Sequence, residues 1–147
     1  MADTHNNDPF MMGIATLASG HPAEALDWFR IDVEANGSPV ASSYLAYCLA
    51  KQNGTYRDAI AMCMEALRVE PRAPEIFLNL GKIYILSGQK RSALRSFQLG
   101  LRYGRNPEIS NELKWLGQRK NPPFSFLPRN HVLNKFTGKI LSRIRLR

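Results

Sequence analysis

The chain has 147 residues, 44% of them hydrophobic, and its 20 basic and 12 acidic residues give a formal charge of +8. This length suits one domain with its own core, and no apolar run approaches the about 18 residues that are needed to span a bilayer. Two cysteines are too few for a disulfide framework and lack the spacing of metal ligands, which favours free thiols in a reducing compartment.

Charge is distributed unevenly along the chain. Residues 1–71 carry nine acids and four bases, whereas residues 72–147 carry three acids and 16 bases. Such polarity favours an acidic partner, an anionic membrane surface or nucleic acid, and also self-association head to tail. The first residues, MADTHNNDPF, are acidic and polar where a secretory signal would be basic and apolar. We therefore expect a cytoplasmic protein, peripheral to the membrane if its basic end contacts lipid.

An internal repeat of 34 residues organises most of the chain. The segments GHPAEALDWFRIDVE, GTYRDAIAMCMEALR and GQKRSALRSFQLGLR align with one another. Each has a glycine, an alanine five residues later and a third matching residue four further on: Gly20, Gly54 and Gly88; Ala25, Ala59 and Ala93; Phe29, Cys63 and Phe97. A constant period of 34 residues at three aligned positions predicts stacked structural units.

The segment before each turn glycine has helical periodicity. In PEIFLNLGKIYILSG the residues at i, i+3, i+4 and i+7 share one face, namely Phe77, Leu80, Gly81 and Tyr84. The earlier units hold a large residue followed by a small one at the matching places: Met12 with Gly13, and Leu45 with Ala46. Each unit is expected to be helix, glycine turn, helix, and such a hairpin buries its apolar stripe only by stacking.

This pattern resembles the tetratricopeptide repeat family. The third unit carries it through Phe77, Leu80, Gly81, Tyr84, Gly88, Ala93, Phe97 and Gly100, and the second through Leu45, Ala46, Leu49, Gly54, Tyr56, Ala59, Cys63, Ala66 and Pro71. The first unit departs at Asp32, where a small apolar residue is usual. The resemblance covers about residues 6–107 and implies an all-α fold. Its three stacked helix-turn-helix hairpins would occupy about residues 6–38, 39–73 and 74–107.

The residues after the third hairpin are expected to cover the end of the stack. Asn106 and Pro107 suit the start of a helix, and the stripe that follows contains Ile109, Leu113 and Leu116. We therefore predict a capping helix over residues 107–120, which completes a domain of residues 1–120.

Residues 121–147 are predicted to form a Pro-rich linker and a basic amphipathic tail. The linker NPPFSFLP has three prolines, which do not fit a helix, and a basic C-terminal helix is predicted from about His131 to Arg145. The expected contact residues of the tail are Lys135, Phe136, Lys139, Ile140, Arg143, Arg145 and Arg147. A helix this short is marginal in water, so an anionic membrane, an acidic partner or the repeats themselves must order it. Interleaved leucine and isoleucine argue against nucleic acid.

No constellation of residues points to catalysis. The three histidines, His5, His21 and His131, have no His, Cys or carboxylate at ligand spacing, and no glycine-rich phosphate loop is present. Cys63 holds an interior packing position, where an inert thiol is expected. We predict no enzyme activity, no catalytic residue, no metal and no cofactor.

The resemblance implies a curved stack whose first helices line a concave groove. By the family pattern the groove residues are Phe10, Ile14, Leu17, Ser43, Tyr47, Lys51, Leu78, Lys82 and Ile85. This surface is mostly apolar with two lysines near one end, which suits an extended peptide or an amphipathic helix with hydrophobic anchors. The alternative is that Phe10, Ile14 and Leu78 belong to the core.

Some family members clamp the C-terminal carboxylate of heat-shock chaperones with lysine and asparagine. The matching positions here are Phe10, Ile14, Tyr44, Leu78 and Lys82. Only Lys82 has suitable chemistry, so the clamp is not carried over. The sequence predicts an interaction module that binds another protein, as an adaptor, an assembly scaffold or a small chaperone. The alternative is a peripheral membrane-associated factor whose basic tail contacts anionic lipid.

Overall fold

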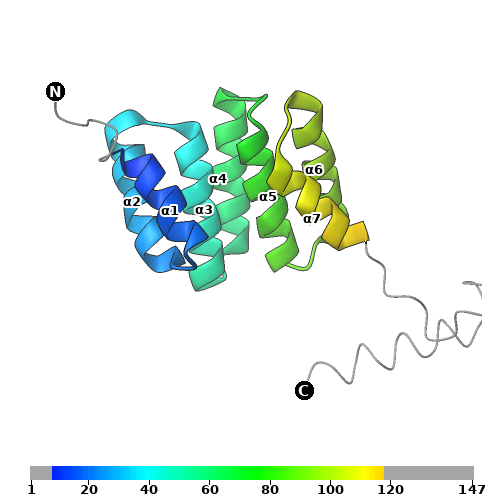
Figure 1. Cartoon of the computed structure of the whole chain (residues 1–147), viewed down its shortest axis with the longest axis horizontal. Coiled ribbons are helices and arrows are strands. Elements are labelled where there is room, and N and C mark those ends of the chain that lie inside the picture. The colour runs from blue at the N-terminus through cyan, green and yellow to red at the C-terminus, as the bar shows by residue number, and fades with distance from the viewer. Residues whose placement is uncertain (1–7, 118–147) are drawn as a thin grey trace, which may run out of the picture. The chain divides into compact units, whose positions relative to one another are not determined.

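The computed structural model describes residues 8–117, and every regular element in that range is an α-helix. The three hairpins are α1 (Pro9–Ala18) with α2 (Pro22–Asn36), α3 (Pro39–Asn53) with α4 (Tyr56–Val69), and α5 (Pro74–Leu86) with α6 (Lys90–Tyr103); α7 (Pro107–Gly117) follows them (Figure 1). The prediction of an all-α stack of hairpins is confirmed. The predicted linker and basic C-terminal helix lie outside the described residues.

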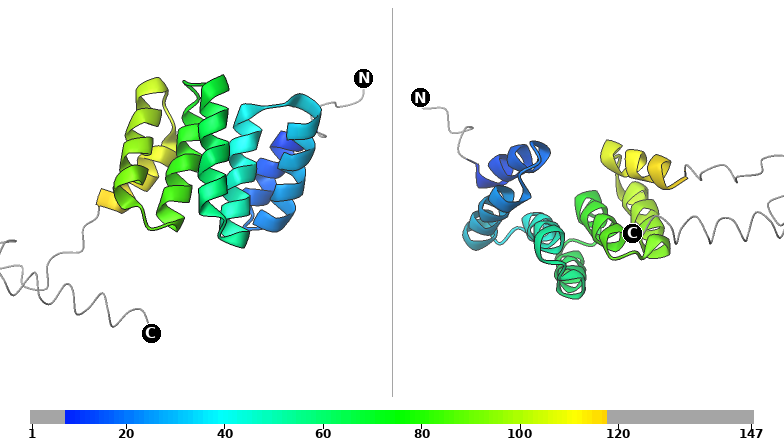
Figure 2. Two further views of the ribbon diagram at one scale, coloured as in Figure 1. Left: turned by 180° about the vertical axis from the view of Figure 1, so that it is seen from behind. Right: turned by 90° about the horizontal axis from the view of Figure 1, so that it is seen from below.

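The chain divides into two units, Met1–Trp115 and Leu116–Arg147, and the first contains the hairpins. Within this unit the helices form an arc (Figure 2, right), with α1, α3, α5 and α7 on its inner side and α2, α4 and α6 on its outer side. The first helix of each hairpin thus faces inward, and α7 continues that series.

Glycines end the first helices of the hairpins. Gly54 and Gly88 have φ angles of 68° and 78°, in the left-handed region that glycine enters without a steric penalty. The Gly54 N–H donates to the carbonyl of Ala50 at 3.0 Å, and the Gly88 N–H donates to that of Ile85 at 3.0 Å. The turn glycines of the sequence repeat are therefore required by the backbone, which must reverse between paired helices.

Short polar side chains cap several helices just before an initial proline. The oxygen atoms of Asp8, Ser38 and Asn106 accept hydrogen bonds from backbone N–H groups two or three residues later, at 3.0, 3.2 and 3.1 Å. Proline fits the next position because its missing N–H would have no partner in the first turn. The predicted cap at Asn106 is confirmed, and it fixes where α7 begins.

Two hydrophobic clusters form part of the core, and α3 contributes to both. The first joins α2 and α3 through Ala25, Leu26, Phe29, Tyr44, Leu45 and Cys48. The second joins α3, α4 and α5 through Ala46, Ala50, Ala59, Cys63, Ala66, Ile76, Leu80 and Ile83. Because neighbouring hairpins share these clusters, the hairpins are not independent units, as expected for a stacked repeat.

Helix α7 packs against the third hairpin with one buried residue, Ile109. Ile109 is fully buried, and a Cβ atom on Gly100 of α6 would lie 2.7 Å from its Cδ1 atom. Trp115, by contrast, is 76% exposed. Helix α7 spans Pro107–Gly117 of the capping helix predicted over residues 107–120, and the last three of those residues lie outside the described range. None of the helices in residues 8–117 combines the length and the apolar character of a membrane span.

Candidate functional site: the inner face

A series of side-chain contacts connects the helices of the inner side. The rings of Phe10 in α1 and Tyr44 in α3 meet edge to face, with centroids 5.7 Å apart. The Lys82 Nζ atom of α5 lies 5.4 Å from the ring centroid of Tyr47 in α3, and 2.8 Å from Oε2 of Glu108 in α7. These contacts run from α1 through α3 and α5 to α7, the helices that Figure 2 shows on the inner side of the arc. We call this surface the inner face.

The end of the inner face near α1 is apolar. Phe10, Ile14 and Leu17 are half-buried and pack against the cluster that contains Phe29 and Tyr44. The rings of Phe29 and Tyr44 stack with centroids 5.1 Å apart, and Phe10 lies 6.0 Å from Phe29. Each of the three α1 residues therefore supports the core with one side and leaves the other side uncovered.

Two predicted groove residues are interior, which corrects the sequence prediction. Leu78 is 1% exposed and Ser43 is fully buried. Leu78 is buried because α5 is covered on all sides, with six consecutive buried residues from Ile76 to Gly81. In such a helix the spacing of apolar residues does not distinguish a solvent-exposed face from a core face. For Leu78 the core alternative was right, and a ligand on the inner face would not touch it.

Ser43 is buried because it joins α3 to α5. Its Oγ atom accepts a hydrogen bond of 2.9 Å from Nδ2 of Asn79 and donates one of 2.7 Å to the carbonyl of Val40. Asn79 is itself fully buried, and its Oδ1 atom has no hydrogen-bond partner among the described residues. This buried hydrogen bond links α3 to α5, two of the helices that form the inner face.

The end of the inner face near α5 carries the two predicted lysines. Lys51 and Lys82 approach the Tyr47 ring, with Nζ atoms 5.8 and 5.4 Å from its centroid, close enough for cation–π attraction. The Lys82 side chain is only 18% exposed, and Glu108 compensates its charge. Lys51 is exposed, so it is the cation that a ligand reaches most easily. Ile85, also predicted here, is half-buried.

Carboxylates near Tyr44 are a feature that the sequence did not reveal. Burial raises the pKa of Tyr44 to about 12, and the negative charges of Glu108 and Glu75 add to this effect. The three residues come from α3, α7 and α5, so no pattern within one helix could have brought them together. The inner face therefore carries both signs of charge, with carboxylates beside Tyr44 and lysines beside Tyr47.

The two thiols are inert at neutral pH. Burial raises the pKa of Cys63 to about 12, and it raises that of Cys48 to about 11 although Lys51 and Lys82 oppose the shift. Both side chains are fully buried, so neither presents a thiolate to solvent. Across residues 8–117 no three His, Cys, Asp or Glu side chains are grouped to hold a metal ion.

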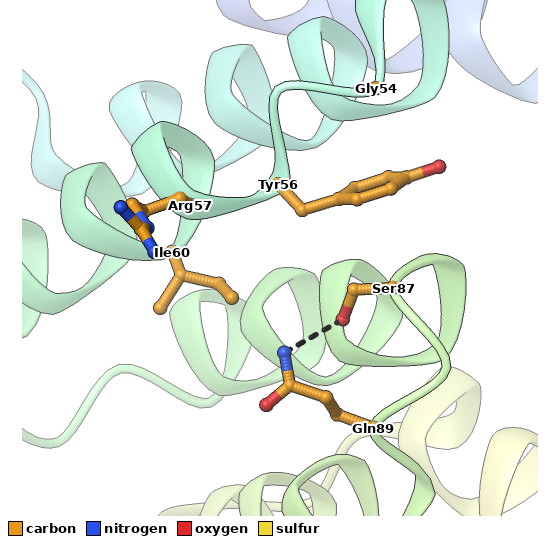
Figure 3. A pocket seen from close by; sticks show the side chains of 6 residues that line it. All are labelled: Gly54, Tyr56, Arg57, Ile60, Ser87 and Gln89. Carbon is orange, nitrogen blue, oxygen red and sulfur yellow. Dashed lines mark hydrogen bonds between the residues drawn. The ribbon is translucent and has the colours of Figure 1, made fainter.

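A shallow hollow of about 400 Å³ lies away from the inner face, at the turn ends of the second and third hairpins (Figure 3). Its lining residues are Gly54, Tyr56, Arg57, Ile60, Ser87 and Gln89. Gln89 Nε2 donates to Ser87 Oγ at 3.1 Å, so part of its polar lining is already satisfied. Sequence reasoning did not find this hollow, because its residues come from two segments that are distant in the sequence, 54–60 and 87–89.

The predicted tail contacts lie outside the described residues, so the structure does not place them. They are Lys135, Phe136, Lys139, Ile140, Arg143, Arg145 and Arg147.

Comparison with known proteins identifies the fold. No protein-family model and no curated protein matches the chain. Among solved structures, the TPR domain of P58(IPK) matches with a TM-score of 0.57 and 14% identity, over 76% of this chain and 33% of that one. The second TPR domain of human RPAP3, in complex with the HSP70 peptide SGPTIEEVD, matches with a TM-score of 0.55 and 18% identity, over 76% and 94%. The chain thus spans about a third of the P58(IPK) chain, and the likeness shows a tetratricopeptide-repeat fold.

Proposed function

We propose that this chain, whose helices form a tetratricopeptide-repeat fold, is a non-enzymatic protein-interaction module. It binds a peptide or an amphipathic helix of another protein on the inner face, as an adaptor, an assembly scaffold or a small chaperone. The observation that carries the proposal is the row of half-buried side chains on successive first helices, from Phe10 and Ile14 of α1 to Tyr47 of α3. Solvated apolar surface of this kind gains free energy when a ligand covers it.

The apolar and charged ends of the inner face suggest how a ligand is oriented along it. Its α1 end offers apolar surface at Phe10, Ile14 and Leu17, and its α5 end offers the exposed ammonium group of Lys51 beside Tyr47. A matching ligand places large apolar side chains over α1 and an acidic group near Lys51. An acidic amphipathic segment meets both requirements.

The HSP70 peptide bound by the RPAP3 domain is a useful reference ligand. This chain has aromatic or aliphatic residues where the carboxylate clamp of related domains has polar ones, and Lys82 is already paired with Glu108 at 2.8 Å. We therefore expect SGPTIEEVD to bind more weakly than peptides with two or more large apolar residues.

Peptide binding by the full chain tests the proposal. Fluorescence anisotropy would compare SGPTIEEVD with apolar-anchored acidic peptides selected from an immobilised library. Tyr47→Ser and Lys51→Glu are expected to weaken the selected peptides by about tenfold or more, as for residues near the centre of an interface. Met64→Ser and Arg57→Glu are matched changes on the outer helix α4, where both residues are exposed, and should leave affinity unchanged. Selected peptides that bind all four variants equally would place the site elsewhere.

The membrane-associated alternative depends on the tail, which the structure does not describe. It predicts sedimentation of the full chain with anionic but not neutral vesicles, sensitive to salt and lost on truncation after Lys120. That result, together with no peptide binding on the inner face, would favour the membrane role over the interaction module.

A further inference from the structure

The outer helix α6 carries a straight row of arginines. Arg91, Arg95, Gln98 and Arg102 are spaced i, i+4, i+7 and i+11, which places them within about 60° of one another and along about 17 Å of helix axis. All four side chains are exposed. Helix α6 contains no acidic residue, and none of the three arginines forms an ion pair with a residue of the described range.

The N-terminal part of the arginine row opposes the stability of its own helix, whereas Arg102 in the last turn suits the helix dipole. Arg91 lies in the first turn, where the helix dipole disfavours positive charge, and it repels Arg95 one turn later. The packing of α6 does not need the row either, because the buried face consists of Ala93, Ser96, Phe97 and Gly100. Folding therefore does not account for Arg91 and Arg95, and an anionic partner would stabilise the row.

The outer helix α2 carries a row of the opposite sign. Glu24, Asp27, Ile31 and Glu34 are spaced i, i+3, i+7 and i+10, within about 80° of one another and along about 15 Å. All four are exposed, and the only cation paired with them in the described chain is Arg30, 3.5 Å from Asp27. We call these the acidic row and the arginine row.

The two rows match in length and spacing. Measured along the helix from Glu24, the acidic row has residues at about 0, 4.5, 10.5 and 15 Å, and from Arg91 the arginine row has residues at about 0, 6, 10.5 and 16.5 Å. Laid side by side in parallel, the rows bring three carboxylates beside three guanidinium groups, with Ile31 beside Gln98.

We infer that this protein self-associates head to tail, with the arginine row of one copy lying along the acidic row of a second copy. Helices α2 and α6 stand at opposite ends of the stack with α4 between them (Figure 1), so the two rows cannot meet within one chain. Arginine is suited to the contact because its planar guanidinium pairs with a carboxylate through two parallel hydrogen bonds.

Other anionic partners fit the arginine row less well. A membrane-binding helix needs a continuous apolar face among its bases, but α6 packs Ala93 and Phe97 inside the fold and exposes large apolar side chains only at Leu101 and Tyr103, in its last turn. Single-stranded nucleic acid needs free rings for stacking, but of the two rings of α6 Phe97 is buried and Tyr103 already stacks on Phe77, with centroids 5.6 Å apart. Helix α4 does not compete as a partner, because its exposed residues include both signs: Arg57, Asp58, Glu65 and Arg68.

Sedimentation velocity on the full chain tests the inference. The wild-type protein should exceed the mass of one chain at about 0.1 M salt, where charges are screened beyond about 10 Å, and should dissociate at about 1 M salt, where that length is about 3 Å. A variant with Arg91→Glu, Arg95→Glu and Arg102→Glu, and another with Glu24→Lys, Asp27→Lys and Glu34→Lys, should each raise the dissociation constant by about tenfold or more.

An equimolar mixture of the two reversed variants is the decisive sample. One variant then has two acidic rows and the other two basic rows, so the mixture should associate although neither variant does alone. The control for the α6 variant, Arg57→Glu, Arg68→Glu and Arg72→Glu, makes the same change in net charge as that variant on exposed residues elsewhere and should associate like wild type. Far-UV circular dichroism verifies that all variants are folded.

Three results would overturn the inference. The first is a wild-type protein that sediments as one chain at all concentrations. The second is loss of association in the α2 variant but not in the α6 variant, because another basic segment would then be the partner of the acidic row. The third is a monomeric protein whose arginine row instead binds anionic vesicles or single-stranded RNA.

Discussion

Phe97 packs directly on the backbone of Gly81. A Cβ atom at Gly81 would lie 2.3 Å from Cε1 of the ring, which is closer than real Cβ contacts come. The first hairpin repeats the arrangement, with 2.6 Å between a Cβ at Gly13 and Cε1 of Phe29. In the second hairpin the larger residue Ala46 replaces the glycine and Cys63 replaces the ring at the matching positions. Where the residue on the first helix is larger, the residue facing it on the second helix is smaller, so the paired helices of each hairpin approach closely.

Gly81→Ala should lower the free energy of unfolding by about 1–3 kcal/mol, because the added methyl group overpacks the contact with Phe97. A loss of stability would be informative, because helix propensity alone would make Gly81→Ala stabilising by about 1 kcal/mol. Urea denaturation measures the change. In a Phe97→Leu background, Gly81→Ala should lower the free energy of unfolding by less than it does in the wild type. Strictly additive losses would show that the two positions do not interact.

Ser43→Ala should destabilise the fold by about 1–3 kcal/mol, because Nδ2 of the buried Asn79 loses its partner at 2.9 Å. In that background Asn79→Leu should recover stability by removing an amide that has no partner left. Thermal unfolding of the wild type, both single variants and the double variant completes the cycle. Ser19→Ala is the control, since Ser19 is exposed, and a Ser43→Ala loss no larger than that control would refute the role of the hydrogen bond.

Stability should fall at alkaline pH because of the buried thiols. The pKa of Cys63 is raised from 9.0 to about 12 and that of Cys48 from 9.0 to about 11, so both stay protonated in the folded state while the unfolded chain ionises them. The resulting stability is complete below about pH 9 and is lost as the pH rises through the folded-state values. The slope is about 1.4 kcal/mol per pH unit for each thiol in that window.

Denaturation midpoints between pH 8 and pH 11 measure this slope. Tyr44 titrates in the same direction, so the thiol contribution is read from a variant with Cys48→Ala and Cys63→Ala, whose pH dependence should be shallower. An identical slope in the two proteins would show that the thiols do not ionise differently in the folded and unfolded states.

Glu108→Gln should lower the pKa of Tyr44, because it removes one of the two carboxylate charges that raise it. The value should remain above 10, since burial is the larger cause and is unaffected. Titration of tyrosine Cζ resonances by NMR measures the shift, and Glu112→Gln on the same helix is the control. The free energy of unfolding should change by no more than about 1 kcal/mol, because Glu108 is 63% exposed.

Much of the fold follows from the amino-acid sequence. The 34-residue period locates the hairpins, and the small residues at Gly13, Ala46 and Gly81 identify where paired helices meet. Asn106 and Pro107 mark the start of α7. These features are predictable because turns, caps and close helix contacts each depend on a few residue types at fixed spacing.

The candidate site was only partly predictable. Family spacing assigned Tyr47, Lys51 and Lys82 to the groove, with the two lysines near one end, and the structure places their Nζ atoms 5.8 and 5.4 Å from the Tyr47 ring centroid. It also assigned Leu78 and Ser43 to the groove, although both are interior. Periodicity describes the faces of one helix, and it fails where neighbouring helices surround that helix on every side.

The sequence by itself determined that this chain folds into stacked helical hairpins, because the size of a residue at a given helical position dictates how closely its neighbour in the hairpin can approach. Only the tertiary structure decided which parts of the first helices stay open, that Glu108 neutralises Lys82 from 26 residues away, and that the rows on α2 and α6 stand at opposite ends. Exposure and ion pairing depend on the positions of helices distant in the chain, and no local pattern contains those positions.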